Sequence, residues 1–204
     1  FNSDSTVRLI VEAERRVYAD RSKYLGDPDF FSVPQEQLLN PSYQLKRMST
    51  LDWQHATPSK DIYPGNLAST EKEETTHYSI VDKQGNSVSV TTTLNGSYGS
   101  LVVVKGDGFL LNNEMDDFSV KPGSPNAYGL IGGEANSITP GKRMLSSMTP
   151  TIIEKDSKLY MVVGTPGGAT IITSVFQAII NVIDFNMTMQ DAVAARRFHS
   201  QWLP

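Results

Sequence analysis

The sequence predicts an α+β fold in which stacked sheets lie between helical layers. Three observations lead to this prediction. Residues 5–25 have an amphipathic helical pattern, residues 76–94 alternate as two strands, and residues 169–185 form a long apolar segment typical of a buried helix. The order of helix, strands and then helices suits a layered arrangement of this kind.

The first 74 residues are expected to be helical and then to lose their structure. In residues 5–25 the apolar side chains fall near one face, and Ser3, Asp4 or Ser5 can cap the helix. One short helix is expected around residues 34–40. From Thr57 onward the chain is rich in charged, Pro and Gly residues, so residues 57–74 are expected to form a solvated tail.

Two β-hairpins are expected after this tail. Residues 76–81 and 87–94 alternate with period two around the turn at 83–86, and residues 151–154 and 159–164 flank a second turn at 155–158. Shorter β-rich runs lie at 101–104 and 109–111. A Pro/Gly loop covers 121–133, and a last helix is expected to begin at 188 with a capping-box spacing.

Composition excludes several classes of function. The net charge is −4 with both signs mixed along the chain, so no basic stripe indicates a nucleic-acid partner. The absence of cysteine excludes a disulfide framework, a thiolate nucleophile and a cysteine-ligated metal. No histidine or carboxylate pair has metal-ligand spacing, so neither a metal nor another cofactor is expected. His77 is expected to be a packed or hydrogen-bonded imidazole, and His199 is assigned no role.

Four motifs occur in a distinctive order. They are Thr75-Thr76-His77-Tyr78-Ser79, residues 111–118, residues 140–151 and residues 164–168. Together they resemble the bacterial γ-glutamyltransferase family of N-terminal-nucleophile hydrolases, from about Ala19 to His199. The resemblance implies a four-layer αββα sandwich, of which this chain covers part.

The resemblance also implies a zymogen that cleaves itself between Glu74 and Thr75. Residues 1–74 would then be the C-terminal part of a large subunit, ending in a flexible tail. Residues 75–204 would be the N-terminal part of the small catalytic subunit, and the remaining segments would complete a heterodimer. Cleavage makes chemical sense, because a threonine hydroxyl needs a base and a new α-amino group, with a pKa of about 8, supplies one on the same residue.

The other catalytic residues follow from the same resemblance. Thr93 matches the threonine whose hydroxyl orients the nucleophile Thr75. Gly167 and Gly168 match the oxyanion site, where two accessible backbone N–H groups are needed.

The donor pocket must bind an α-carboxylate and an α-ammonium group. Ser146 and Ser147 match the residues for the carboxylate. The residues matching the ammonium site are Asn95, Glu114 and Asp117. Tyr128, in the Pro/Gly loop, matches a lid position over the bound donor.

The expected function is γ-glutamyl transfer and hydrolysis in glutathione metabolism, through an acyl-enzyme on Thr75. Glutathione or glutamine would be the donor, and water, an amino acid or a peptide the acceptor. One alternative is a cephalosporin or glutaryl acylase, although Asp117 with Ser146 and Ser147 favours amino-acid recognition. Another is a binding-only relative that is not processed. The family resemblance alone implies a periplasmic or secreted location.

Overall fold

The computed structural model describes residues 1–63, 75–127 and 129–202. Its chain forms two compact units, each assembled from distant segments. One comprises 1–71, 115–145 and 199–204 and is called the helical unit; the other comprises 72–114 and 146–198 and is called the hairpin unit. Glu74 and Tyr128 lie outside the described residues.

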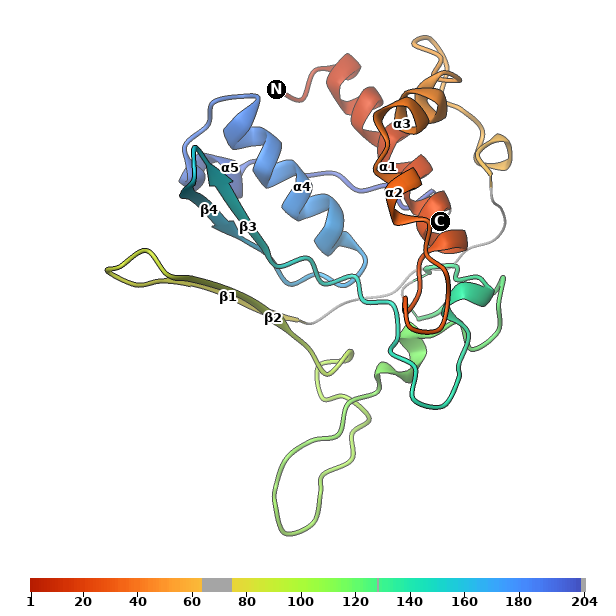
Figure 1. Cartoon of the computed structure of the whole chain (residues 1–204), viewed down its shortest axis with the longest axis vertical. Coiled ribbons are helices and arrows are strands. Elements are labelled where there is room, and N and C mark those ends of the chain that lie inside the picture. Colours follow the sequence, from red (N-terminus) through yellow and green to blue (C-terminus); the bar gives the residue numbers. More distant parts are fainter. Residues whose placement is uncertain (64–74, 128, 203–204) are drawn as a thin grey trace. The chain divides into compact units, whose positions relative to one another are not determined.

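The helical unit begins with α1, Asp4–Tyr24, as expected (Figure 1). The Ser3 Oγ caps it by accepting a hydrogen bond from the Thr6 N–H at 3.3 Å. The short helix α2, Gln35–Leu38, is also confirmed. A third helix, α3, Pro41–Met48, was not expected. It carries an N-terminal signal, because the Asn40 side chain accepts from the Ser42 N–H at 2.8 Å and proline occupies the first helical position.

The expectation of a solvated tail from Thr57 is wrong for the described part of that segment. The Thr57 N–H donates to the Glu12 carboxylate at 3.0 Å, and Arg15 donates to the Thr57 carbonyl at 2.8 Å and to the Ser59 hydroxyl at 2.8 Å. Ile62 is buried beyond the short 3-10 turn Ser59–Asp61. Thr57 and Ser59 therefore provide hydrogen-bond partners for Glu12 and Arg15, two charged side chains that α1 buries.

The Pro/Gly loop is not the simple surface segment that its composition predicts. Leu130 and Ile131 are buried, and the Gly123 N–H donates to the Gly132 carbonyl at 2.9 Å. A bridge also pairs Pro125 with Ile131. The 3-10 turns Glu114–Asp117 and Glu134–Asn136 lie on either side of this loop in the sequence. The loop is thus anchored at its base within the helical unit.

The hairpin unit contains both expected hairpins. Strands β1, Thr76–Val81, and β2, Ser87–Thr92, pair antiparallel, and the second strand ends two residues earlier than expected. Strands β3, Thr151–Lys155, and β4, Lys158–Val163, pair likewise. Their turn residues Asp156 and Ser157 both have positive φ, 53° and 59°, as in a type I′ turn that matches the twist of its strands.

Helices α4, Thr170–Ile183, and α5, Met189–Ala194, complete this unit. Figure 1 shows α4 lying across the β3–β4 hairpin. The core between them is formed by Met161, Val163, Ile171, Val175 and Ala178. Thr188 caps α5 by accepting from the Asp191 N–H at 3.1 Å, which confirms the expected helix start.

The β-rich runs after β2 form a looser ribbon than expected. Val103 and Leu110 make an isolated bridge, and the Val104 N–H donates to the Phe109 carbonyl at 2.9 Å. Gly106 and Gly108 turn the chain with φ of 100° and 76°. Neither run becomes a regular strand.

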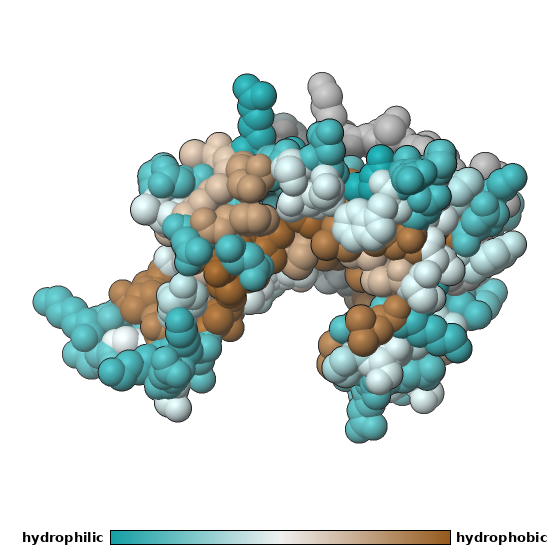
Figure 2. Space-filling view, turned by 90° about the horizontal axis from the view of Figure 1, so that it is seen from above, coloured by the Kyte–Doolittle hydropathy of each residue, from teal (hydrophilic) through white to brown (hydrophobic). Residues whose placement is uncertain are grey.

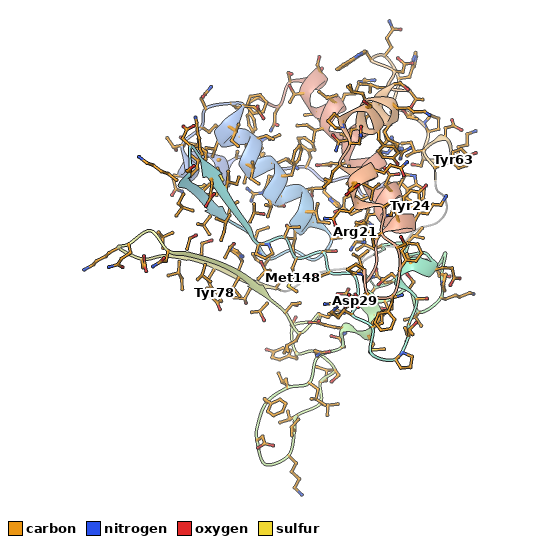
Figure 3. The ribbon with its side chains drawn as sticks, viewed as in Figure 1. Arg21, Tyr24, Asp29, Tyr63, Tyr78 and Met148 are labelled. Atoms are coloured by element: carbon orange, nitrogen blue, oxygen red, sulfur yellow. The ribbon has the colours of Figure 1, made fainter. Side chains whose placement is uncertain are left out.

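Large hydrophobic side chains remain on the surface of the hairpin unit. The space-filling view shows brown, hydrophobic surface (Figure 2), and Tyr78, Ile80 and Val88 of the first hairpin are 46%, 56% and 49% exposed. Figure 3 shows Tyr78 on β1. None of the helices in residues 1–63, 75–127 and 129–202 combines the length and the apolar character that a membrane span requires.

Candidate active site

The first hairpin brings Thr75 and Thr93 to one end of its ladder. Thr76 pairs with Thr92, so continuing this register by one residue places Thr75 opposite Thr93. Both threonines line a pocket of about 530 Å³. Its described lining residues all belong to the hairpin unit and are Thr75, Thr76, Thr92, Thr93, Leu94, Gly96, Ser97, Pro166 and Gly167.

The loop after β2 is held in place by its own backbone and by Asn113. The Asn95 N–H donates to the Thr93 Oγ1 at 2.9 Å, which fixes the hydroxyl oxygen. Asn95 is buried, adopts a left-handed φ of 73°, and donates from its side chain to the Asn113 carbonyl at 3.2 Å. The Asn113 side chain in turn accepts from the Gly96 N–H at 2.9 Å. These hydrogen bonds therefore hold the turn that carries Thr93 in place.

Gly167 and Gly168 form the turn that leads into α4. Their φ values of 137° and 45° favour glycine, and their carbonyls accept from the N–H groups of Thr170 and Ile171. Among the described residues, no backbone carbonyl accepts a hydrogen bond from either glycine N–H. An oxyanion near Gly167 would meet these donors and the positive end of the α4 dipole.

The proposed ammonium-binding carboxylates differ in environment. Burial raises the pKa of Glu114, in the hairpin unit, which favours its neutral form. Asp117 is in the helical unit and lines a second pocket, of about 240 Å³, together with Arg21. Arg21, labelled on α1 in Figure 3, is buried; burial lowers its pKa, whereas the charge of Asp117 acts in the opposite direction. Asp117 thus has a buried cation beside it.

The predicted site residues fall in different units. The hairpin unit brings together Thr75, Thr93, Asn95 and Gly167, whereas Asp117 belongs to the helical unit. Ser146 and Ser147 are half-buried in the hairpin unit, where the Ser146 Oγ accepts from the Met148 N–H at 3.0 Å. The roles predicted for Glu74 and Tyr128 lie outside the described residues.

His77 is a packed imidazole, as expected, and the ring of His199, for which no role was expected, is packed as well. The His77 Nδ1 lies 2.8 Å from the Thr91 hydroxyl, and its ring packs on Gly164 so closely that an added Cβ would lie 2.2 Å from it. The His199 ring lies edge-on to Tyr18, with centroids 5.7 Å apart. Burial lowers the pKa of both histidines. The described residues contain no group of three metal-ligating side chains.

Two asparagines that brace these loops were missed by sequence reasoning. Asn113 falls inside the 111–118 motif, so its position was visible although its role was not. Asn136 is buried and lies in no motif that the sequence analysis identified. The hydrogen-bond partners of its side chain, Asp117 and Leu145, lie in other segments of the sequence, so no local pattern could have revealed the role of Asn136.

Comparison with known proteins gives a consistent result. The gamma-glutamyltranspeptidase family model matches residues 1–204. The chain is 52% identical over 204 residues to the glutathione hydrolase proenzyme of Escherichia coli K12, covering 100% of this chain and 35% of that protein. The chain therefore spans about a third of that relative's length.

Two solved structures support the fold. A mutant of Helicobacter pylori gamma-glutamyltranspeptidase has a TM-score of 0.61 and 63% identity, covering 62% of this chain and 68% of that one. A cephalosporin acylase from Bacillus halodurans has a TM-score of 0.78 and 28% identity, covering 96% of this chain and 33% of that one. The α+β class and the N-terminal-nucleophile hydrolase fold are confirmed, with this chain forming part of the sandwich.

Proposed function

The chain belongs to the gamma-glutamyltranspeptidase family, and from this we propose that the protein transfers γ-glutamyl groups through Thr75 after cleavage between Glu74 and Thr75. The observation that carries the proposal is that Thr75 and Thr93, which flank the paired residues Thr76 and Thr92, line one pocket together with Gly167. Nucleophile, orienting hydroxyl and oxyanion donor are the three parts that acyl transfer requires.

Self-cleavage would come first. The Thr75 hydroxyl attacks the Glu74 carbonyl carbon, the peptide C–N bond breaks, and the departing nitrogen takes a proton to become the Thr75 α-amine. Water then hydrolyses the resulting ester, which releases the Glu74 carboxylate and restores the hydroxyl. The new α-amine provides the base that the hydroxyl lacked.

The transfer cycle would use the same atoms. The Thr75 hydroxyl attacks the γ-carbonyl of the donor while the α-amine takes its proton, and the oxyanion binds the N–H groups of Gly167 and Gly168. Collapse breaks the amide, and the leaving amine receives the proton. Water or an acceptor amine then attacks the γ-glutamyl ester and regenerates Thr75. Thr93, held by the Asn95 N–H at 2.9 Å, would orient the attacking oxygen.

Donor recognition is proposed to divide between two groups of residues. Asp117, with Glu114 and Asn95, would bind the α-ammonium, and the hydroxyls of Ser146 and Ser147 would bind the α-carboxylate. The proposed donors are glutathione and glutamine, with water, an amino acid or a peptide as acceptor. Tyr128 would cover the bound donor.

The proposed partner in assembly is the remainder of the two subunits. The chain spans 35% of the Escherichia coli relative, and Tyr78, Ile80 and Val88 leave an exposed apolar face on the first hairpin. A face of this kind favours burial against another segment. The proposed location, periplasmic or secreted, depends only on the family resemblance, and cell fractionation would test it.

The acylase alternative has weaker support. The cephalosporin acylase covers almost all of this chain but is 28% identical, against 52% for the glutathione hydrolase proenzyme. The relatives also argue against a binding-only protein, because the Escherichia coli protein is named a glutathione hydrolase proenzyme and the Helicobacter pylori protein a gamma-glutamyltranspeptidase.

A donor assay would test the proposal. The full-length protein is incubated with γ-glutamyl p-nitroanilide and with glutaryl p-nitroanilide, which lacks the α-ammonium, each with and without glycylglycine. We expect faster release of p-nitroaniline from the first donor and a γ-glutamyl-dipeptide product when glycylglycine is present. Preference for the glutaryl donor would support the acylase instead. No release from either donor by protein cleaved before Thr75 would contradict the proposal.

A further inference from the structure

The Asn136 side chain connects two segments that carry proposed donor-binding residues. It is 4% exposed, within the helical unit. Its Nδ2 donates to the Asp117 carbonyl at 2.7 Å, and its Oδ1 accepts from the Leu145 N–H at 2.9 Å. Leu145 is bonded directly to Ser146 in the chain. One amide therefore holds the backbone of Asp117 and the residue before Ser146.

Asn136 is itself fixed by its own backbone. Its N–H donates to the Gly133 carbonyl at 3.1 Å, and its carbonyl accepts from the Ser119 N–H at 2.9 Å. The Gly133 N–H donates to the Ser22 carbonyl of α1 at 2.8 Å. The Asn136 side chain thus extends from backbone that is hydrogen-bonded, through Gly133, to α1. Its two side-chain hydrogen bonds then hold Asp117 and Leu145 in place relative to this backbone.

The chemistry at position 136 requires a primary amide. One contact needs a donor and the other an acceptor, and a side chain of this length with both is asparagine. Aspartate keeps the acceptor for Leu145 but, when ionised, has no donor for Asp117. Leucine has a similar volume and makes neither contact, so the Asp117 carbonyl and the Leu145 N–H, both in half-buried residues, would lose their partner.

We propose that Asn136 is a positioning residue for the donor, setting Asp117 for the α-ammonium and the chain at Leu145 for the α-carboxylate. The inference rests on the proposed function, because it assigns Asn136 a role in that same donor site. It touches backbone rather than substrate. Its loss should therefore weaken recognition of both donor groups while leaving Thr75 and its self-cleavage in place.

The test compares three anilides in the full-length, self-cleaved protein: γ-glutamyl, glutaryl, which lacks the ammonium, and 4-aminobutyryl, which lacks the carboxylate. The ratio of kcat/KM for the first donor to that for the second measures ammonium recognition. The ratio of the first to the third measures carboxylate recognition. Partial unfolding cancels from both ratios, because it removes active enzyme equally for every donor.

Asn136→Leu should lower both ratios about tenfold, mainly through KM of the γ-glutamyl donor. Asn136→Asp, which keeps the Leu145 contact, should lower the ammonium ratio and spare the carboxylate ratio. Asp117→Asn should do the same. The matched control is Asn181→Leu: Asn181 is also buried, lies on α4 and donates to the Ala192 carbonyl at 3.5 Å, so its loss should change thermal stability and neither ratio.

The outcomes separate the two proposals. Wild-type ratios near one would overturn the proposed donor site as a whole, and the Asn136 role with it. Wild-type discrimination that Asn136→Leu and Asn136→Asp leave unchanged would overturn the Asn136 role alone. If Asn136→Leu does not fold, Asn136→Asp decides the question by itself through its ammonium ratio.

Discussion

Asp27 and Arg143 form a charged cluster within the helical unit. The Asp27 Oδ2 accepts from the Arg143 backbone N–H at 2.9 Å and from its Nε at 3.0 Å, while the Oδ1 accepts from Nη2. The Asp27 side chain is 1% exposed. Cleavage before Thr75 would place these residues on different polypeptides, so the pair would help to hold the two subunits together.

Replacing Arg143 with methionine should lower the thermal unfolding midpoint of the cleaved protein, because it leaves the Asp27 carboxylate buried without its cation. The hydrogen bonds from Arg143 hold the pKa of Asp27 well below its ordinary value of about 4. The stabilisation is therefore complete above that ordinary pKa and is lost as the pH falls toward the depressed one.

Calorimetry from neutral to acid pH would check this prediction. The difference in midpoint between wild type and Arg143→Met should be largest near neutral pH and shrink on acidification. Asp29→Asn is the control, because the Asp29 side chain is 72% exposed and should contribute little. A difference that grows toward acid pH would be incompatible with the pair as described.

Thr93→Val should reduce kcat about a hundredfold, because an isosteric methyl replaces the hydroxyl that would orient Thr75. Thr93→Ser should keep most of the activity. Thr91→Val is a matched control: its hydroxyl contacts His77, and Thr91 does not line the pocket. Steady-state kinetics on γ-glutamyl p-nitroanilide measures all three. Equal kcat for Thr93→Val and Thr91→Val would remove Thr93 from the mechanism.

Asp117 and Glu114 should differ in their effect on donor binding. Asp117→Ala should raise the donor KM by an amount equivalent to about 2 kcal/mol or more, because it leaves the ammonium unpaired. Glu114→Gln should change KM less. Because burial raises the pKa of Glu114, its ionised form costs stability above that pKa, and Glu114→Gln should raise the unfolding midpoint at neutral pH. Similar KM changes in both variants would contradict this division.

Tyr128→Ala should leave self-cleavage intact, because that step precedes donor binding, while changing the donor KM and the balance of hydrolysis against transfer. The measurement is the product ratio at fixed donor and glycylglycine concentrations. A point substitution is a sharper test than deleting residues 122–132, which would also remove the buried Leu130 and Ile131. An unchanged ratio and KM would mean that Tyr128 does not cover the donor.

Local patterns predicted the hairpins and the main helices because their causes are local. Alternation of β-branched residues specifies β1 and β2, and the Asn40-Pro41 signal at the start of α3 was present but overlooked. The docking of Thr57 was not predictable, since its partner Glu12 lies 45 residues away and polar composition is equally compatible with solvent.

The candidate site likewise has one part that the sequence predicts and another part that it does not. The hairpin register is readable from the sequence, so the placement of Thr75 and Thr93 beside the terminal pair Thr76–Thr92 follows once the strands are identified. The bracing contacts of Asn136 join residues separated by turns of irregular geometry. Sequence spacing carries no information about such contacts, and only the three-dimensional structure reveals them.

Intact-mass spectrometry of the full-length protein, produced without added protease, tests the central claim most directly. The account predicts two polypeptides for wild type and for Thr75→Ser, the second beginning at residue 75, and a single uncleaved chain for Thr75→Ala. A Thr75→Ala protein cleaved at the same bond would show that another group makes the cut and would contradict the account.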